Sequence, residues 1–256
     1  MPSAILPTRL IRIAVRGTCL LCCIAACLLE FLLRSIFGSL SLTRRAEILH
    51  RWSSYTLRAM NISILVNGSP PRSGLIVSNH LSYLDIMAFS TAAPCIFVSK
   101  REVRAWPGVG WIATLAASIY VDRSRRQETH AVQPAMQAAL AEGLRLVLFP
   151  EGTSSDGARV LRFHSSLFQP AVDLQAQVFA ASIAYTVPDG MPGTEVCYWG
   201  NMTLVPHMMN LLTKDSVTAT VSFAPTGFRF NDRKAAAEQM HCEVVRLWAP
   251  TLVASP

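Results

Sequence analysis

The sequence predicts an α/β domain, a mixed sheet flanked by helices, behind an apolar and basic N-terminal segment. From residue 62 onward, short runs rich in β-branched and aromatic residues alternate with helical stretches, a pattern typical of layered α/β domains. The chain has 256 residues, enough to bury a sizeable core in one domain. Hydrophobic residues make up 51% of it and charged residues only 15%, which favours a protein at a membrane surface.

Residues 1–60 are predicted to form membrane-associated helices, and residues 61–256 the α/β domain. The first 60 residues contain eight arginines and two glutamates, so they hold six of the seven net positive charges. Such a segment suits an anionic leaflet, where each cation contributes about 1 kcal/mol. The uncharged run Gly17–Leu29 extends about 20 Å as a helix, short of the roughly 30 Å hydrocarbon core. We expect a helix that lies in or dips into the interface, and a second helix near 43–60.

Two other interpretations of this segment are weaker. A cleaved signal peptide would also begin with a basic stretch and an apolar run, but no small-x-small cleavage site follows the run. A nucleic-acid partner is not expected, because the arginines flank Leu, Ile, Cys and Phe and not polar residues on an open face. Four of the seven cysteines lie in the apolar run at helical spacing, which favours packing over a redox or metal site.

The α/β pattern predicts the order of elements. Strands are expected at 62–66, 75–78, 95–99, 118–121, 145–149, 178–183, 195–199 and 217–223. Helices are expected at about 83–92, 125–142, 204–212 and 231–248. No internal repeat interrupts this alternation, so one layered domain is predicted.

A histidine and an aspartate follow the strand predicted at 75–78. The run Asn79-His80-Leu-Ser-Tyr-Leu-Asp85 begins where that strand ends, and α/β sheets bind ligands at the carboxyl ends of their strands. Histidine is the natural base near neutral pH. Asp85 is placed to bond the other ring nitrogen and fix its tautomer, so His80 and Asp85 are the candidate catalytic pair. In the alternative interpretation Ser82 and Asp85 are a helix-capping pair and His80 is an ordinary turn residue.

Two further blocks carry polar residues at strand ends. The apolar run Leu146–Phe149 leads into Pro-Glu151-Gly152-Thr153, where proline and glycine end the strand and leave backbone N–H groups at its tip. Between this block and His80, a glycine-containing segment leads to a predicted strand that ends at Asp122-Arg123. Each block alone is equally typical of a solvated turn or a surface ion pair.

Together, the three blocks resemble the glycerolipid acyltransferase family, typified by bacterial lysophosphatidate acyltransferase. That family carries Asn-His-x4-Asp, then a Gly…Asp-Arg block, then Phe-Pro-Glu-Gly-Thr. Here Glu151 follows His80 by 71 residues and the resemblance covers residues 50–225. It implies an acyltransferase domain over 61–256, with His80 as general base and Asp85 as its orienting partner. It assigns the acceptor site to Arg123, Glu151, Gly152 and Thr153.

The same resemblance implies the partners of the reaction. The acyl donor is expected to be acyl carrier protein or acyl-CoA, used as a co-substrate, and the acceptor a lysolipid. No metal and no bound cofactor are expected. The N-terminal segment would hold the enzyme among membrane lipids, at the cytoplasmic face of the inner membrane.

Position 154 departs from the lysophosphatidate enzymes, which continue Phe-Pro-Glu-Gly-Thr with an arginine associated with the acceptor phosphate. Here the residue is Ser154, and a serine cannot supply the charged fork of arginine. The extended block to Gly157 and the run Tyr198–His207 look like the lyso-ornithine lipid acyltransferase branch, in which a hydroxyl on an amide-linked fatty acid accepts the acyl group. We therefore expect lyso-ornithine lipid as acceptor, with Ser154 and Arg159 added to the acceptor-binding candidates.

Other functions stay open at this point. If Arg159 or Arg162 binds a phosphate, the product is phosphatidic acid. A hydrolase would need an activated nucleophile, and the sequence has no Gly-x-Ser-x-Gly elbow. A non-catalytic lipid-binding protein would not need both His80 and Asp85. A metal enzyme is not expected, because no His/Asp/Glu cluster has ligand spacing.

Overall fold

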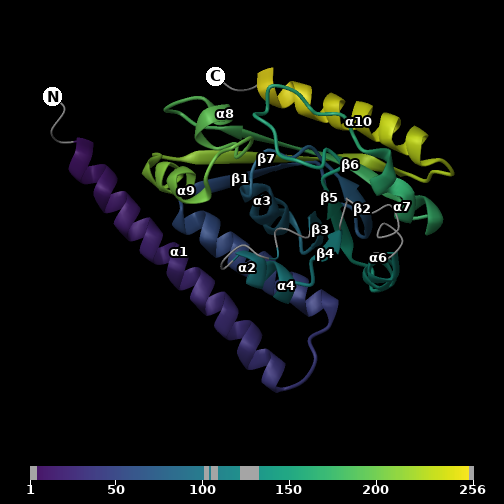
Figure 1. Ribbon diagram of the computed structural model, residues 1–256, viewed down its shortest axis with the longest axis horizontal. Helices are drawn as coiled ribbons and strands as arrows, with labels where there is room; N and C mark the ends of the chain where they lie inside the picture. Colours follow the sequence, from purple (N-terminus) through teal and green to yellow (C-terminus); the bar gives the residue numbers. More distant parts are fainter. Residues whose placement is uncertain (1–4, 101–103, 105–108, 122–132, 254–256) are drawn as a thin grey trace.

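The computed structural model describes residues 5–100, 104, 109–121 and 133–253, and Figure 1 shows their arrangement. Within this part of the chain one sheet has the strand order β1-β7-β6-β2-β5-β3-β4. The strands are β1 (Ile62–Asn67), β2 (Gly74–Val77), β3 (Ile96–Lys100), β4 (Ile119–Val121), β5 (Arg145–Leu148), β6 (Val178–Thr186) and β7 (Val217–Phe228). β6 and β7 are antiparallel, whereas the other neighbouring pairs are parallel. The predicted mixed sheet is therefore confirmed.

Helices cover both faces of this sheet. They are α1 (Ile5–Ile36), α2 (Leu42–Ala59), α3 (Leu84–Ala92), α4 (Val109–Leu115), α6 (Gln133–Ala141), η2 (Ser165–Phe168), α7 (Gln169–Asp173), α8 (Pro192–Glu195), α9 (Leu204–Thr213) and α10 (Arg233–Val253). In Figure 1, α10 lies along one side of the sheet, and α1 and α2 lie toward the opposite side.

The central strands are buried on both faces because side chains alternate along them. In β2, Ile76 packs into the core beneath α2 and α3, whereas Leu75 and Val77 pack into the core that includes α10. All three are at most 1% exposed. Burial of each such side chain contributes about 1.5–3 kcal/mol, so the carboxyl end of β2 is a rigid support for the residues that follow it.

Helix α1 continues past Glu30, the acidic residue that interrupts its apolar sequence. The Glu30 carboxylate accepts hydrogen bonds from Arg34, at 2.6 Å, and from the Trp52 indole of α2, at 2.8 Å, and it also pairs with Arg51. These partners compensate the buried part of the charge and fasten α1 to α2. The segment Arg9–Ile36 is long and apolar enough to cross a membrane, by length and composition alone.

The structure corrects one predicted strand and extends another strand and one helix beyond their predicted ends. The segment 195–199 is not a strand: it follows α8 as a loop whose backbone bonds to Leu81 and Pro192 instead of to the sheet. β7 continues to Phe228, and α10 continues to Val253. Of the helix expected at 125–142, the described part is Gln133–Ala141, and residues 125–132 lie outside the described part.

Candidate active site

The loop that carries His80 leaves the sheet between two other strands. β2 is hydrogen-bonded to β5 on one side and to β6 on the other, so residues that follow β2 and β5 emerge side by side. The Asn79 side chain fixes this loop to β6: its amide donates to the Ile183 carbonyl and its oxygen accepts from the Ile183 N–H, each at 2.9 Å. Asn79 is only 1% exposed. The backbone at His80 therefore has a fixed position relative to β6.

His80 and Asp85 form the predicted pair. His80 Nδ1 lies 2.7 Å from Asp85 Oδ2. Since an ionised carboxylate only accepts, Nδ1 donates and Nε2 keeps its lone pair. The imidazole stacks on Phe149, with ring centroids 4.3 Å apart and planes 13° apart, and its side chain stays 23% exposed. The ring is thus held on one side and accessible on the other, as a general base requires.

Asp85 is a fully buried carboxylate with donors on both oxygens. Its Oδ2 also accepts from the backbone N–H groups of Leu81, at 2.7 Å, and Ser82, at 3.1 Å. Its Oδ1 accepts from the Tyr185 hydroxyl at 2.6 Å. Of the expected capping pair only the bond from the Ser82 N–H to the Asp85 carboxylate is present: the N-cap residue of α3 is Tyr83, without a side-chain cap bond, and the Ser82 hydroxyl has no partner among the described residues. Asp85 instead holds the His80 loop together, because its carboxylate bonds to three consecutive residues of that loop.

Glu151 follows β5 and is buried near Asp85. It is 3% exposed, Oε1 accepts from the Leu161 N–H at 3.2 Å, and Oε2 has no hydrogen-bond partner within the described part of the chain. Burial raises the pKa of Glu151 to about 8, with a smaller upward effect from the Asp85 charge, against backbone N–H groups of Leu161 and His80 that lower it. A protonated Glu151 can donate a hydrogen bond at neutral pH, whereas Asp85 accepts.

The turn after Glu151 is joined to the His80 loop and to the segment before α9. Gly152 has a φ of 75°, a conformation that favours glycine. The Ser155 N–H donates to the His80 carbonyl at 2.9 Å. The Ser154 hydroxyl donates to the Tyr198 carbonyl. The hydroxyl proton at position 154 is thus engaged within the protein, and its lone pairs remain for a ligand. Thr153 is exposed at the tip of the turn.

The arginine candidates differ in what the structure says of them. Arg123 lies outside the described residues. Arg159 and Arg162 are exposed, and neither has a hydrogen bond or ion pair within the described part of the chain. Both follow the turn that contains Gly152 and Ser154. They are therefore available for an anionic group.

Sequence reasoning missed two residues that organise this site. Asn79 belongs to the motif but was expected only to precede the histidine, and its clamp on Ile183 becomes visible only when β2 and β6 are neighbours. Tyr185 lies 100 residues after Asp85 on a strand whose other side chains read as core. No local pattern identifies such a contact.

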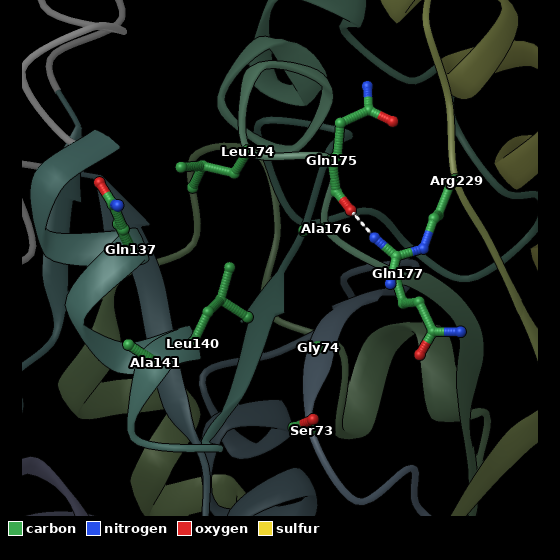
Figure 2. A pocket seen from close by; sticks show the side chains of 10 residues that line it. All are labelled: Ser73, Gly74, Gln137, Leu140, Ala141, Leu174, Gln175, Ala176, Gln177 and Arg229. Carbon is green, nitrogen blue, oxygen red and sulfur yellow. Dashed lines mark hydrogen bonds between the residues drawn. The ribbon is translucent and has the colours of Figure 1, made fainter.

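The protein has two hollows of interest, one among the helices around α3 and one at the opposite end of the sheet from His80. An apolar cavity of about 140 Å³ lies between α1, α2, α3, α4 and α9, lined among others by Cys23, Trp52, Ile86 and Ile112. A second hollow, of about 360 Å³ and with a mixed polar and apolar lining (Figure 2), is bordered by Gly74, Leu140 and Arg229, among others. Since Gly74 begins β2, that hollow lies at the end of the sheet away from His80. Among the described residues no group of three or more His, Cys, Asp or Glu is arranged to hold a metal ion.

Comparison with known proteins gives relatives of one kind. The protein-family model described as Acyltransferase matches residues 63–185. The lyso-ornithine lipid O-acyltransferase of Rhizobium meliloti is 33% identical over 198 residues, which cover 72% of this chain and 68% of the relative. The corresponding protein of Brucella abortus is 35% identical over 193 residues, 70% and 72% of the two chains.

More distant similarities point the same way. A 1-acyl-sn-glycerol-3-phosphate acyltransferase of Neisseria gonorrhoeae is 29% identical over 195 residues, 75% of each chain. The crystal structure of a 1-acyl-sn-glycerophosphate acyltransferase from Thermotoga maritima matches with a TM-score of 0.70 over 97% of both chains, at 19% identity, which shows that the fold is shared. By its sequence relatives and by the family model that spans His80, Asp85 and Glu151, the chain belongs to the acyltransferase family and is an acyltransferase.

Proposed function

We propose that this enzyme transfers a fatty acyl group from an acyl thioester to the hydroxyl of lyso-ornithine lipid. The observation that carries the proposal is the His80–Asp85 pair, with Nδ1 donating at 2.7 Å to a buried carboxylate. The acceptor assignment rests on the relatives, of which the two most identical reported above are named lyso-ornithine lipid O-acyltransferases.

The proposed reaction uses His80 twice. Nε2 takes the proton of the acceptor hydroxyl while its oxygen attacks the thioester carbonyl carbon, and Asp85 stabilises the imidazolium that forms. The tetrahedral intermediate then expels the thiolate, which receives the proton from Nε2. One ester bond forms, one thioester bond breaks, and the products are the acylated lipid and the carrier thiol. The side chains of this pair supply the base, so we propose no metal and no bound cofactor.

The turn at residues 151–159 is proposed to bind the acceptor head group, together with Arg123. Ser154 stands where an arginine is usual in the lysophosphatidate enzymes, so the fixed fork for a phosphate is absent at this position. Ornithine presents a carboxylate and an ammonium instead. Arg159, exposed and without a partner among the described residues, is a suitable ligand for the carboxylate, and Glu151, Gly152 and Thr153 line the approach.

The apolar cavity is proposed to hold an acyl chain. It opens among the helices that pack around α3, the helix that begins directly after the His80 loop, and its lining is almost entirely apolar. A saturated chain placed there gains about 0.8 kcal/mol for each buried CH₂ group. We propose acyl carrier protein or acyl-CoA as the donor.

Residues 1–60 are proposed as the membrane-associated part and residues 61–256 as the acyltransferase domain. One face of α1 is held by the rest of the protein: Cys27 and Phe31 are buried, and Arg12 and Arg16 bond to carbonyl groups at the end of α9. The other face exposes leucines along its length. A helix tied to the domain at both ends suits one leaflet better than a crossing of both, and we place it on the cytoplasmic face of the inner membrane.

A competition assay tests the acceptor. Membranes that contain the protein receive labelled acyl carrier protein thioester with lyso-ornithine lipid and lysophosphatidate at equal concentration, and the two products are separated by mass. We expect ornithine lipid to dominate. If phosphatidic acid dominates, the acceptor assignment is wrong. In that case Arg159→Ala and Arg162→Ala, assayed singly with lysophosphatidate, identify the arginine that binds its phosphate.

A further inference from the structure

We infer that Tyr185 is a positioning residue of the acyltransferase, which acts on His80 through Asp85. The inference rests on the proposed role of His80 as base and goes beyond it, because it adds a third member to the pair. We place Tyr185 behind the carboxylate, because its hydroxyl bonds to Asp85 Oδ1 and only 4% of the residue is exposed. It sets the charge and orientation of the carboxylate that holds the base.

The hydrogen bonds form a continuous chain. The Tyr185 hydroxyl donates to Asp85 Oδ1 at 2.6 Å, and Asp85 Oδ2 accepts from His80 Nδ1 at 2.7 Å. Asp85 is 0% exposed and Tyr185 is 4% exposed, so water does not compete for either bond. Tyr185 provides the hydrogen bond found at Oδ1 within the described residues, whereas Oδ2 has three donors.

The backbone around this chain is fixed. Tyr185 lies on β6 opposite Ala219 of β7, two residues after Ile183, which the Asn79 side chain clamps to the His80 loop. Both ends of this hydrogen-bond chain are therefore fixed to β6, the Tyr185 end directly and the His80 end through Asn79. Burial, followed by the neighbouring Asp85 charge, raises the pKa of Tyr185 well above its ordinary value. The hydroxyl is therefore a donor at neutral pH. Two other titratable groups face Asp85: Glu151, whose pKa burial raises to about 8, and the Cys197 thiol, whose pKa burial raises to about 12.

A donor at Oδ1 has a defined consequence for catalysis. It spreads the negative charge of Asp85 over both oxygens and so moderates the pull of the carboxylate on the imidazolium. Without it, the charge concentrates at Oδ2, and the imidazolium state of His80 is favoured more strongly. A larger fraction of the enzyme then carries a protonated base at low pH, and the buried Oδ1 is left unpaired.

The pH dependence of turnover tests this inference. In Tyr185→Phe, which keeps the ring, we expect kcat to fall roughly tenfold with KM within about twofold of wild type. The acid limb of the pH–rate profile is expected to move to higher pH by roughly half a unit or more. The matched control is Tyr120→Phe, a partly buried tyrosine of β4 whose hydroxyl lies 2.9 Å from the Thr114 hydroxyl and does not bond to Asp85. Its acid limb should coincide with that of wild type.

Two further measurements separate positioning from folding. Incorporation of 3-fluorotyrosine at position 185 keeps the shape and strengthens the donor, so the acid limb should move to lower pH. In an Asp85→Asn background, Tyr185→Phe should cost less than about twofold. An unmoved acid limb in both position-185 variants, or an undiminished cost in the Asp85→Asn background, overturns the inference. All profiles use whichever acceptor gives turnover with wild type, so a wrong acceptor does not affect the result. Loss of all turnover in wild type would contradict the proposed function instead.

Discussion

Two buried carboxylates beside His80 have opposite surroundings. Asp85 receives donors on both oxygens, which fix the orientation of its carboxylate beside His80. Glu151 interacts only with backbone N–H groups, those of Leu161 and His80, its Oε2 has no hydrogen-bond partner among the described residues, and burial raises the pKa of its carboxyl to about 8. The site therefore places a fully hydrogen-bonded carboxylate against His80 and, beside it, an acid that is largely neutral at pH 7.

The surroundings of Glu151 predict a stability that falls as the pH rises. The folded-state pKa of about 8 lies above the ordinary value of 4.5, so the folded protein binds this proton more tightly than the unfolded chain does. The stabilisation is complete below about pH 4.5 and is lost as the pH rises toward about 8, by up to a few kcal/mol. Glu151→Gln imitates the neutral acid, so its free energy of unfolding should vary less across this range than that of wild type.

Denaturant unfolding at several pH values between 5 and about 8 provides the measurement. Glu238→Gln, the same substitution at an exposed position of α10, is the control and should keep the wild-type slope. A Glu151→Gln variant with the same pH dependence as wild type would show that Glu151 is ionised in the folded protein.

The sequence predicted the contact between His80 and Asp85, but not the residues that hold this pair in place, Asn79 and Tyr185. His80 and Asp85 were found because their spacing is short and their chemistry complementary, and the structure places them in contact. The clamp by Asn79 and the hydroxyl of Tyr185 depend on β6 lying next to β2, a pairing between segments about a hundred residues apart. A tyrosine on a strand is typical of core packing, so nothing local distinguishes Tyr185.

Among the elements, the errors have tertiary causes. The segment 195–199 was predicted as a strand because Val, Cys, Tyr and Trp suit one. Val196 and Cys197 are indeed buried, but as a loop whose Tyr198 N–H donates to Leu81 at 2.8 Å. In α1, Glu30 interrupts the apolar run in the sequence, yet the helix continues because Arg34, Arg51 and Trp52 surround that charge. In both cases the deciding contacts come from distant parts of the sequence: Leu81 for the loop, and Arg51 and Trp52 of α2 for Glu30.

The exposed face of α1 predicts how the protein is held on lipid. Leu21, Leu29 and Leu32 are 68%, 53% and 60% exposed on a helix whose other face is packed. We expect Leu21→Lys with Leu29→Lys to reduce the fraction recovered with membranes severalfold, because apolar burial is lost and charges enter the interface. Sedimentation with liposomes that contain anionic lipid measures this fraction.

Leu65→Lys, on the edge strand β1, is the matched control, since Leu65 is 55% exposed and lies outside α1. Its membrane recovery should equal that of wild type. Recovery of the α1 double variant at the wild-type level would place the membrane-binding surface elsewhere on the protein.

On the scale of the whole molecule, the sheet separates two hydrophobic cores. The α10 side holds a core of its own, while the other side carries α1, α2 and α3 and the apolar cavity. His80 follows the carboxyl end of β2, a central strand of the sheet, and the loop that carries it leads into α3. An acyl chain in the cavity and a head group at the Glu151 turn would therefore approach the base from lipid and from water.

The central claim is that His80, oriented by Asp85, activates a lysolipid hydroxyl for acyl transfer. Its most direct test is the initial rate of ornithine lipid formation by membranes that contain wild type, His80→Ala or Asp85→Asn at equal amounts of folded protein. The substrates are labelled acyl carrier protein thioester and lyso-ornithine lipid, and the product is quantified by mass. We predict a rate at least 10² to about 10⁴ lower for His80→Ala and a severe loss for Asp85→Asn. A rate within about threefold of wild type for either variant would contradict the mechanism.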